Sequence, residues 1–356
     1  MKLHAVVPVY NVEPYISKFL DSIICQDSDA VNYILVNDGS TDRSGEICDS
    51  YAGKDSRLKV IHTTNGGVSR ARNTALDFIS NNSEPDDYVI FFDPDDYLTS
   101  PHAISDIKTE IEKSHPDLLL YNYMVNNTLI HSVLQIGGYS GQEIGQQLYP
   151  WVLLGVKKNG VILSASLFRG AFSINIINNF RLRFREDIRK SEDILFYAKF
   201  LTLIEKVSLS TVTPYNYNIR PGSLTTTYRM PSMLGIEKGL SILSDFLQYA
   251  QECPGIDKKE VDNYFKGRYI GLVINFVIGL TDSRSGLSTP QINSQLNELY
   301  AVEELSRKLK DIGAFDGLPM KKKIEGIMVK HRFGLVFYGR LFHFTKKLRN
   351  KIIHRC

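Results

Sequence analysis

The chain has 356 residues, of which 43% are hydrophobic and 23% charged, a composition that excludes an intrinsically disordered protein. Its longest nearly apolar stretch, Tyr269–Leu280, is twelve residues long and contains Asn275, so it is too short to cross a bilayer. The net charge of +3 combines +10 in residues 321–356, which hold eleven Lys and Arg and one acid, with −7 in residues 1–320, a distribution that does not favour a nucleic-acid-binding protein.

The first hundred residues predict strands that alternate with helices. Apolar runs without alternation indicate strands buried on both faces, and apolar residues at spacings of three and four indicate helices. This order predicts an α/β fold with a mostly parallel sheet covered by helices, whose ligands bind beyond the carboxyl ends of the strands. The expected elements are a strand at Leu3–Val9, a helix at Val12–Ile24, a strand at Tyr33–Asn37, a helix that ends near Tyr51, a strand at Leu58–His62, a helix from Gly67 to Ile79 and a strand at Tyr88–Phe92.

The second part of the chain shows weaker patterns that become helical after Tyr228. Short apolar runs indicate strands there, and longer periodic segments indicate helices. The expected elements are strands at Leu118–Tyr123 and Gly160–Phe168 with a long loop between them, and helices at Ser191–Leu203, Ser241–Tyr249, Val261–Leu280 and Gln291–Lys310, with a loop at Thr281–Pro290.

Three acidic clusters follow or begin these elements: Asp38, Asp93–Asp96 and Glu192-Asp193. Each alone is consistent with a turn or a helix cap. Together, carboxylates in one cleft repel one another and need a cation, and Mg²⁺ or Mn²⁺ accepts few protein ligands when a diphosphate supplies the others. An EF-hand is excluded because its sixth position, counted from Asp93, is Leu98 and not glycine. The sequence also lacks the glycine-rich phosphate loops of P-loop and dinucleotide-binding proteins.

Five segments in order resemble the motifs of family 2 glycosyltransferases, which are inverting enzymes with the GT-A fold. The resemblance covers about residues 1–225, and its one departure is Pro94 inside the D-x-D motif. The segments are Pro8-Val9-Tyr10-Asn11, Val36-Asn37-Asp38-Gly39-Ser40-Thr41-Asp42, Gly67-Val68-Ser69-Arg70-Ala71-Arg72-Asn73, Phe92-Asp93-Pro94-Asp95-Asp96 and Ser191-Glu192-Asp193.

The resemblance implies roles for residues of the donor site. Asp38 would accept a hydrogen bond from uracil N3–H, which cytosine cannot offer. Pro8 and Tyr10 would shape the base pocket, and Asp93 would hold the ribose hydroxyls. Further implied residues are Arg72 and Asn73, which would close the base pocket, Asp95, which would bind Mn²⁺ or Mg²⁺ with Asp93, and Arg220, which would lie near the diphosphate.

The resemblance also implies a mechanism. Asp193 would act as general base toward the acceptor hydroxyl, so that one displacement converts an α-linked UDP-sugar into a β-linked product. For Arg220, a surface arginine before a Pro-Gly turn is an equal alternative. Trp151, the only tryptophan, is more often a core residue than an acceptor platform.

The last residues predict a basic amphipathic helix. Such a helix can lie on an anionic membrane, which we favour slightly, or pack on the acidic body of the protein. The apolar positions recur every three or four residues, with Arg340, Lys347, Lys351 and Arg355 between them, and they are Phe333, Phe337, Leu341, Phe344, Leu348 and Ile352.

We therefore expect residues 1–225 to form a GT-A domain with a donor half at 1–117 and an acceptor half at 118–225, followed by a helical extension at 226–320 and the basic tail at 321–356. The expected activity is metal-dependent transfer of a hexose or N-acetylhexosamine from a UDP-sugar to a saccharide, linked to a polyprenyl diphosphate, in O-antigen or capsule synthesis. The expected location is cytoplasmic, at the inner face of the cell membrane. The alternatives are a nucleotidyltransferase-like enzyme and a non-catalytic nucleotide-sugar-binding module.

Overall fold

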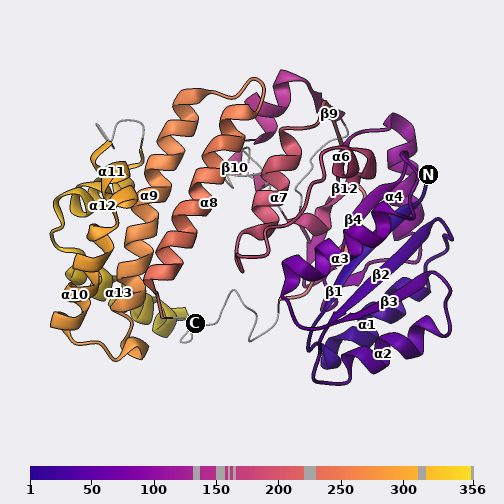
Figure 1. Ribbon diagram of the computed structural model, residues 1–356, viewed down its shortest axis with the longest axis horizontal. Coiled ribbons are helices and arrows are strands. Elements are labelled where there is room, and N and C mark those ends of the chain that lie inside the picture. The colour runs from indigo at the N-terminus through magenta and orange to yellow at the C-terminus, as the bar shows by residue number, and fades with distance from the viewer. Residues whose placement is uncertain are drawn as a thin grey trace. The chain divides into compact units, whose positions relative to one another are not determined.

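The computed structural model of the chain, shown in Figure 1, describes residues 1–130, 137–149, 157–158, 161–162, 166–219, 230–311 and 318–353. It divides into two compact units. The α/β unit consists of Met1–Pro221 and Glu252–Ile256, and the helical unit consists of Gly222–Gln251 and Asp257–Cys356.

The first part of the α/β unit confirms the alternation of strands and helices predicted for the first hundred residues. Each predicted element is present, and the observed bounds differ from the expected ones by a few residues at most. The elements are β1 (Leu3–Val9), α1 (Glu13–Ile24), β2 (Val31–Asp38), α2 (Ser44–Ala52), β3 (Leu58–Thr63), α3 (Val68–Ser80) and β4 (Tyr88–Phe91), followed by β5 (Tyr97–Leu98) and α4 (Ala103–Ser114).

The main sheet of this unit has the strand order β3-β2-β1-β4-β12-β6-β13-β9 among the described residues. Strands β1 to β4 are parallel, whereas β12 runs antiparallel to both β4 and β6. A second sheet has the order β5-β14-β7-β8. The remaining strands are β6 (Leu118–Leu120), β7 (Tyr123–Val125), β8 (Thr128–Ile130), β9 (Gly137–Ser140), β12 (Gly170–Ser173), β13 (Lys206–Leu209) and β14 (Tyr215–Tyr217), with the two-residue pair β10 (Lys157–Lys158) and β11 (Val161–Ile162).

Two strand predictions in the second part of the chain hold only in part. The predicted strand Leu118–Tyr123 is divided at Tyr121, because β6 belongs to the main sheet and β7 to the second sheet. Of the predicted strand Gly160–Phe168, Val161–Ile162 forms β11 and Leu167–Phe168 lies in a 3-10 turn (Leu167–Arg169), while residues 160 and 163–165 lie outside the described residues. The strand that joins the main sheet is β12, directly after the turn. The predicted helix Ser191–Leu203 is confirmed as α7 (Glu192–Leu201), and the short helix α6 (Ile174–Asn179) and a π-helical turn (Ile144–Leu148) were not predicted.

The two faces of the main sheet are covered by different helices. Alternate residues of β1, including Leu3, Ala5 and Val7, are fully buried in one apolar core together with residues of α1 and α4. The opposite face packs against α3, which Figure 1 shows across the sheet from α1 and α2. An aromatic cluster continues the core beside β4 and β12, and its members are Phe91, Phe172, Phe184 and Phe196.

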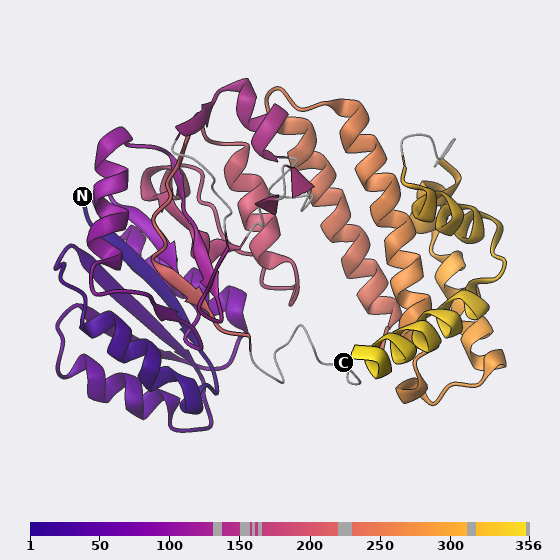
Figure 2. The same ribbon diagram turned by 180° about the vertical axis from the view of Figure 1, so that it is seen from behind.

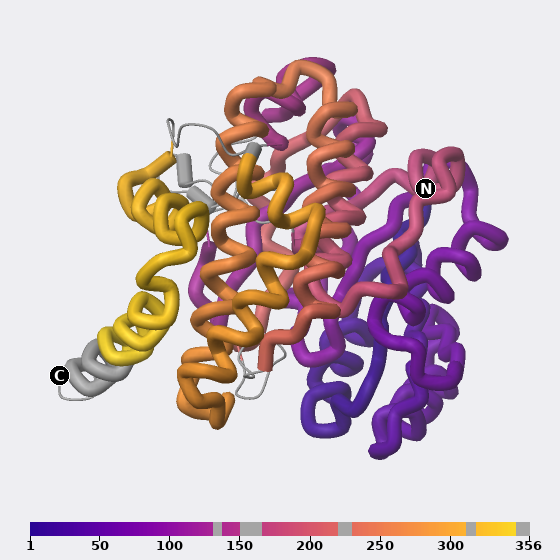
Figure 3. Tube along the Cα trace, turned by 60° about the vertical axis from the view of Figure 1, so that its left-hand side comes forward, coloured from indigo at the N-terminus to yellow at the C-terminus, as the bar shows by residue number. Residues whose placement is uncertain are grey.

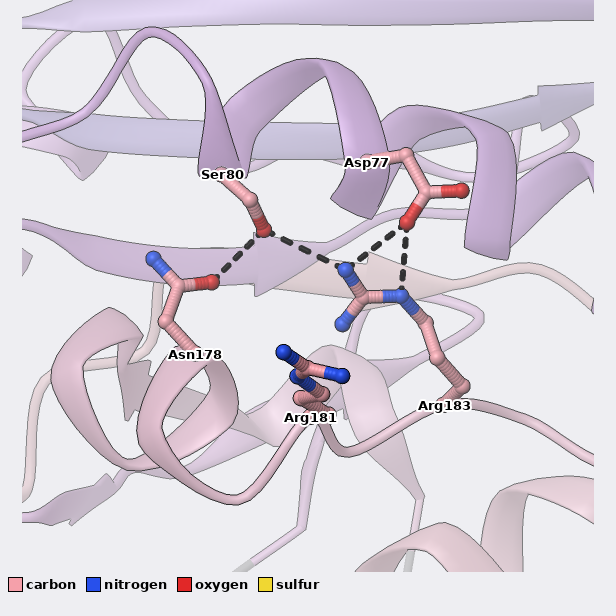
Figure 4. A pocket seen from close by; sticks show the side chains of 5 residues that line it. All are labelled: Asp77, Ser80, Asn178, Arg181 and Arg183. Atoms are coloured by element: carbon pink, nitrogen blue, oxygen red, sulfur yellow. Dashed lines mark hydrogen bonds and ion pairs between the residues drawn. The ribbon is translucent and has the colours of Figure 1, made fainter.

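A side-chain network at the end of α3 anchors the segment that leads to α7. Arg183 donates to Asp77 at 2.8 Å and to the Ser80 hydroxyl at 3.3 Å, and Ser80 donates to Asn178 at 2.6 Å. Figure 4 shows these groups around a pocket that Arg181 also lines. The network fixes residues 178–183 to α3 and therefore restrains the chain before the acidic motif at α7.

The helical unit contains two long helices that lie side by side, α8 (Met233–Glu252) and α9 (Lys258–Leu280), as Figures 2 and 3 show. The predicted helix Gln291–Lys310 is in fact two helices, because the backbone is extended at Val302 between α10 (Thr289–Ala301) and α11 (Glu303–Asp311). The tail forms α12 (Met320–His331) and α13 (Leu335–Ile353), both packed against α9. None of the helices in the described part of the chain is both long and apolar enough to cross a bilayer.

Candidate active site

The carboxyl ends of β2, β1 and β4 form the edge of the sheet that holds most of the candidate residues. The chain leaves β1 toward β2 and β3 on one side and returns to β4 on the other side. Such a reversal leaves a crevice outside the strand ends, which is where open α/β sheets bind ligands. Pro8, Tyr10, Asp38 and the loop after β4 all lie at these ends.

The loops after β1 and β2 are locked together by hydrogen bonds. The Asp42 carboxylate accepts from the backbone N–H groups of Glu13 and Ser44, each at 3.0 Å. Asn11 accepts from the Thr41 N–H at 2.8 Å and donates its own backbone N–H to Ser40 at 3.2 Å. The two loops that would contact a nucleobase are thus one rigid assembly.

Asp38 is 3% exposed and is held by the loop that precedes α3. One carboxylate oxygen accepts from the Gly66 N–H and the other from the Gly67 N–H, both at 2.8 Å. Gly67 has φ +92°, a left-handed conformation that glycine adopts without steric cost. The Oδ1 atom also accepts from the Thr63 hydroxyl at 3.5 Å. Asp38 is therefore oriented by the protein, and the second lone pair of Oδ2 is what remains for a ligand.

The loop after β4 is fixed by the second sheet. The buried Asp96 carboxylate accepts from the Tyr215 hydroxyl at 2.5 Å and from the Asn218 N–H at 2.7 Å. The Asp93 N–H donates to the same tyrosine oxygen at 3.1 Å. Tyr215 of β14 thus holds both ends of Asp93–Asp96, which includes Asp95.

Arg72 of α3 joins this loop to the head of α7. Its guanidinium lies 3.5 Å from Asp93 and 3.2 Å from Glu192, and its side chain is only 8% exposed. Ser191 has φ +65°, a conformation that costs a non-glycine residue about 1–2 kcal/mol. This turn presents Glu192 and Asp193 at the N-terminus of α7, where the helix dipole favours carboxylates.

Three acids of this cluster, Asp93, Asp96 and Asp193, have a pKa above that of an isolated carboxyl group. Burial and repulsion by Glu192 raise the pKa of Asp193 to about 6. Burial and the charge of Asp93 raise the pKa of Asp96 to about 8. The pKa of Asp93 is also raised, by burial and by Asp95 and Glu192, although Arg72 opposes the shift. Besides burial, repulsion by neighbouring carboxylates contributes to all three shifts, so the site has more acidic groups than the single Arg72 can neutralise.

This excess charge fits a divalent cation. The described residues contain no group of three or more side chains that could hold a metal by themselves. Mg²⁺ is commonly bound by one or two carboxylates with substrate phosphates as the other ligands. Asp93 and Asp95 are the carboxylates that match this requirement.

Among the remaining predicted residues, the structure describes Pro8, Tyr10 and Asn73. Pro8 lies in β1 beyond the last residue paired with β4, where a residue without an N–H is tolerated, and Tyr10 is 48% exposed just after the strand. The Asn73 side chain accepts from the Phe184 N–H at 2.8 Å and donates to the Phe184 carbonyl at 2.9 Å. These bonds are made within the protein, and the role of Asn73 at the donor site stays a prediction. Arg220 and Trp151 lie outside the described residues.

The sequence analysis did not assign roles to three residues that organise the site, Glu192, Tyr215 and Asp42. Glu192 and Asp42 lie within the family 2 motifs, so the sequence already indicated that these positions belong to the site. Tyr215 lies 119 residues from Asp96, its hydrogen-bond partner, and no local pattern marks it.

Comparisons with known proteins find relatives among glycosyltransferases. The sequence model described as Glycosyl transferase family 2 matches residues 5–162. The chain is 30% identical to glycosyltransferase GlyA of Streptococcus pneumoniae over 86% of its own length and 43% of GlyA. It is 31% identical to the uncharacterized glycosyltransferase EpsJ of Bacillus subtilis over 64% of each chain. The chain thus spans less than two thirds of these relatives.

The fold is similar to that of a solved glycosyltransferase. TarS 1-349 of Staphylococcus aureus in complex with UDP has a TM-score of 0.65 and 20% identity, covering 97% of this chain and 92% of that one. The same TarS fragment with UDP-GlcNAc has a TM-score of 0.64 and 21% identity, covering 94% and 91%. The predicted GT-A fold, with a mostly parallel central sheet and C-terminal helices, is confirmed.

Proposed function

Since the chain belongs to glycosyltransferase family 2, we propose that it transfers a hexose or an N-acetylhexosamine from a UDP-sugar to a cell-surface saccharide, with inversion. The observation that carries the proposal is the Arg72 bridge, which joins the acidic loop after β4 to the head of α7. It brings the candidate donor-binding acids and the candidate base to one place. The complexes of TarS with UDP and UDP-GlcNAc support a uridine diphosphate donor.

In the proposed donor complex, the base pocket consists of Pro8, Tyr10 and Asp38. Asp38 accepts a hydrogen bond from uracil N3–H through a carboxylate lone pair that the Gly66 and Gly67 N–H groups do not use. Asp93 holds the ribose hydroxyls. Two more residues take part in the proposal, Asn73 beside the pocket and Arg220 near the diphosphate.

A bound Mn²⁺ or Mg²⁺ would be held by Asp95 and Asp93 and would supply Lewis-acid neutralisation of the departing UDP. Arg72 keeps Asp93 in place and adds a fixed positive charge to the same loop. Tyr215 and Asp96 hold the backbone of the loop, so little reorganisation accompanies donor binding.

Asp193 is the proposed general base. Its Oδ1 accepts the Ile194 N–H at 2.8 Å, which fixes the carboxylate at the first turn of α7. The acceptor hydroxyl becomes acidic only as its bond to the anomeric carbon forms, so a carboxylate is basic enough to take the proton. A single displacement at an α-linked donor then gives a β-linked product.

The proposed setting is the assembly of a surface polysaccharide such as an O-antigen or capsule, with the acceptor saccharide linked to a polyprenyl diphosphate on the cytoplasmic side of the membrane. The relatives support a surface glycan, since TarS is named as a poly(ribitol-phosphate) β-N-acetylglucosaminyltransferase.

The test is UDP release from a panel of UDP-sugars with and without Mn²⁺. We expect Mn²⁺-dependent release that Asp95→Ala abolishes, and that Asp193→Asn lowers about 10²–10⁴-fold while donor binding stays near that of the wild type. Asp86→Ala, which removes an exposed acid before β4 begins, is the matched control and should be fully active.

Three outcomes would contradict the proposal. Full Mn²⁺-dependent activity of Asp95→Ala would remove the metal assignment. Donor binding without UDP release in the presence of any acceptor would indicate a binding module. Release of pyrophosphate would indicate a nucleotidyltransferase.

A further inference from the structure

Large apolar side chains are exposed along α12 and α13. On each helix they recur at spacings of three and four residues, so they form one stripe per helix. Several large apolar side chains exposed in a row mark an interaction site more often than a free surface. We call these two stripes the apolar face; its residues and exposed fractions are Met320 (71%), Ile324 (51%) and Ile327 (42%) on α12, and Phe337 (71%), Leu341 (46%) and Phe344 (61%) on α13.

The opposite sides of both helices are packed inside the helical unit. On α13, Leu335 is buried and His343 bonds the Ile278 carbonyl of α9 at 2.8 Å. A Cβ added at Gly339 would lie 2.3 Å from the Thr281 hydroxyl, so the backbones approach closely there. On α12, Met328 and Val329 are buried. The helices therefore do not need the apolar face for their own folding.

The two helices that carry the apolar face have a strongly basic sequence. Between Met320 and Ile353 the sequence has ten Lys and Arg and a single acid, Glu325. Glu325 is 2% exposed and bonds Lys322 and Tyr338, both at 2.5 Å. Lys321 lies 3.8 Å from the same carboxylate, and Lys330 and Lys346 are exposed.

We propose that the apolar face binds the surface of an anionic lipid bilayer. The exposed aromatic and aliphatic side chains would enter the boundary between headgroups and acyl chains, and the surrounding lysines and arginines would pair with anionic headgroups. A second copy of the chain fits poorly, because it would bring two sets of like charges together. The same spacing continues to Leu348 and Ile352, whose side chains lie outside the described part.

This proposal extends the proposed function, since a polyprenyl-linked acceptor lies in such a bilayer. Lipid binding is measured without any sugar donor, however, so either proposal can fail while the other holds.

The experiment is flotation of the full chain with vesicles of neutral phosphatidylcholine, alone or mixed with about one third phosphatidylglycerol. We expect the wild type to float with the anionic vesicles only, and Phe337→Glu to weaken this binding at least about tenfold. The matched control is Phe180→Glu, which changes a phenylalanine of similar exposure (55%) in the α/β unit and should bind as the wild type does.

A second pair of variants tests the charges. Lys330→Glu with Lys346→Glu should weaken binding to anionic vesicles about as strongly, whereas Lys54→Glu with Lys59→Glu, two exposed lysines of the α/β unit, should have little effect. Truncation before α12 is a poor test, because it would uncover the side of α9 on which α12 and α13 pack. Melting curves verify that each variant is folded.

The proposal is overturned if the wild type does not float with anionic vesicles at low salt. It is also overturned if Phe337→Glu and Phe180→Glu bind equally, or if Phe337→Glu converts a lipid-free dimer into a monomer without changing flotation, which would assign the face to a second copy.

Discussion

Asp193 combines two properties that a general base needs, a fixed position and a pKa close to the working range. Burial and Glu192 raise the pKa of its carboxyl to about 6. Only the deprotonated carboxylate can take a proton, so activity is present above this pH and lost as the pH falls through it. We expect kcat/KM to level off above about pH 6 and to fall about tenfold per unit below it.

A pH profile of kcat/KM for UDP release checks this expectation. The residual activity of Asp193→Asn should lack the acidic limb, because the amide does not titrate. Circular dichroism over the same pH range verifies that the protein stays folded. An acidic limb of unchanged position in Asp193→Asn would assign the titration to another group.

Asp38 offers a second test, because the carboxylate both holds the Gly66–Gly67 loop and is proposed to read uracil. Asp38→Asn keeps the size of the side chain but replaces one acceptor oxygen by a donor. If Asp38 accepts from uracil N3–H, the variant should weaken UDP binding by about tenfold or more and narrow the preference for UDP over CDP. Calorimetry with both nucleotides measures this. An equal loss for UDP and CDP would leave Asp38 only its role in the loop.

The candidate acids could be predicted because each stands next to a strong local pattern. Asp38 is the last residue of the apolar strand β2, Asp93 and Asp95 follow β4, and Asp193 lies in the first turn of helix α7. The contacts that organise them could not be predicted, because they join distant segments. Arg72 and Glu192 are separated by 120 residues, and only the folded sheet brings them together.

The strands and helices are predicted most accurately where the local sequence alone determines them. The parallel strands β1, β2 and β4 are buried on both faces and stand out as apolar runs between helices, whereas the edge strand β3 is partly exposed. The strands of the second part have two to four residues each, and most of them pair with distant segments. A short apolar run such as Leu118–Tyr123 contains no signal for the division at Tyr121. The break at Val302 did have one, since Glu303 and Glu304 are typical of a helix start.

The turn between α8 and α9 provides a prediction about how the α/β unit is held together. Glu252–Ile256 belongs to that unit, and Glu252 pairs with Lys199 of α7 at 2.7 Å. Gly255 has φ +79°, and an added Cβ would lie 2.4 Å from the Gln142 carbonyl. Gly255→Ala should therefore destabilise the protein by more than the cost of the left-handed conformation alone, about 1–2 kcal/mol.

Gly141→Ala is the control for this variant. Gly141 also has positive φ (+49°), but an added Cβ would meet nothing within 4 Å. Denaturant unfolding of the two variants should show a larger loss for Gly255→Ala. Equal losses would mean that the turn moves away from Gln142 at little cost.

The charge of the whole molecule is divided along the chain, with −7 in residues 1–320 and +10 in residues 321–356. The acidic site lies in the α/β unit and the apolar face with its basic surroundings in the helical unit. The two properties therefore belong to different compact units of the chain. This separation predicts that salt affects lipid binding and the chemical step differently.

Activity toward a polyprenyl-diphosphate-linked acceptor in anionic vesicles should fall about tenfold when NaCl is raised from about 0.05 to 0.5 M, because the Debye length shortens from above 10 Å to below 5 Å and exposed charges no longer attract the bilayer. Activity toward a short soluble acceptor should change little, since the Arg72 bridge is largely buried and less screened. Parallel assays of both acceptors at each salt concentration measure the difference. Lys330→Glu with Lys346→Glu should already have the low activity toward the vesicle acceptor at low salt and show no further decrease. An equal decrease for both acceptors would assign the salt effect to the donor site and separate membrane binding from catalysis.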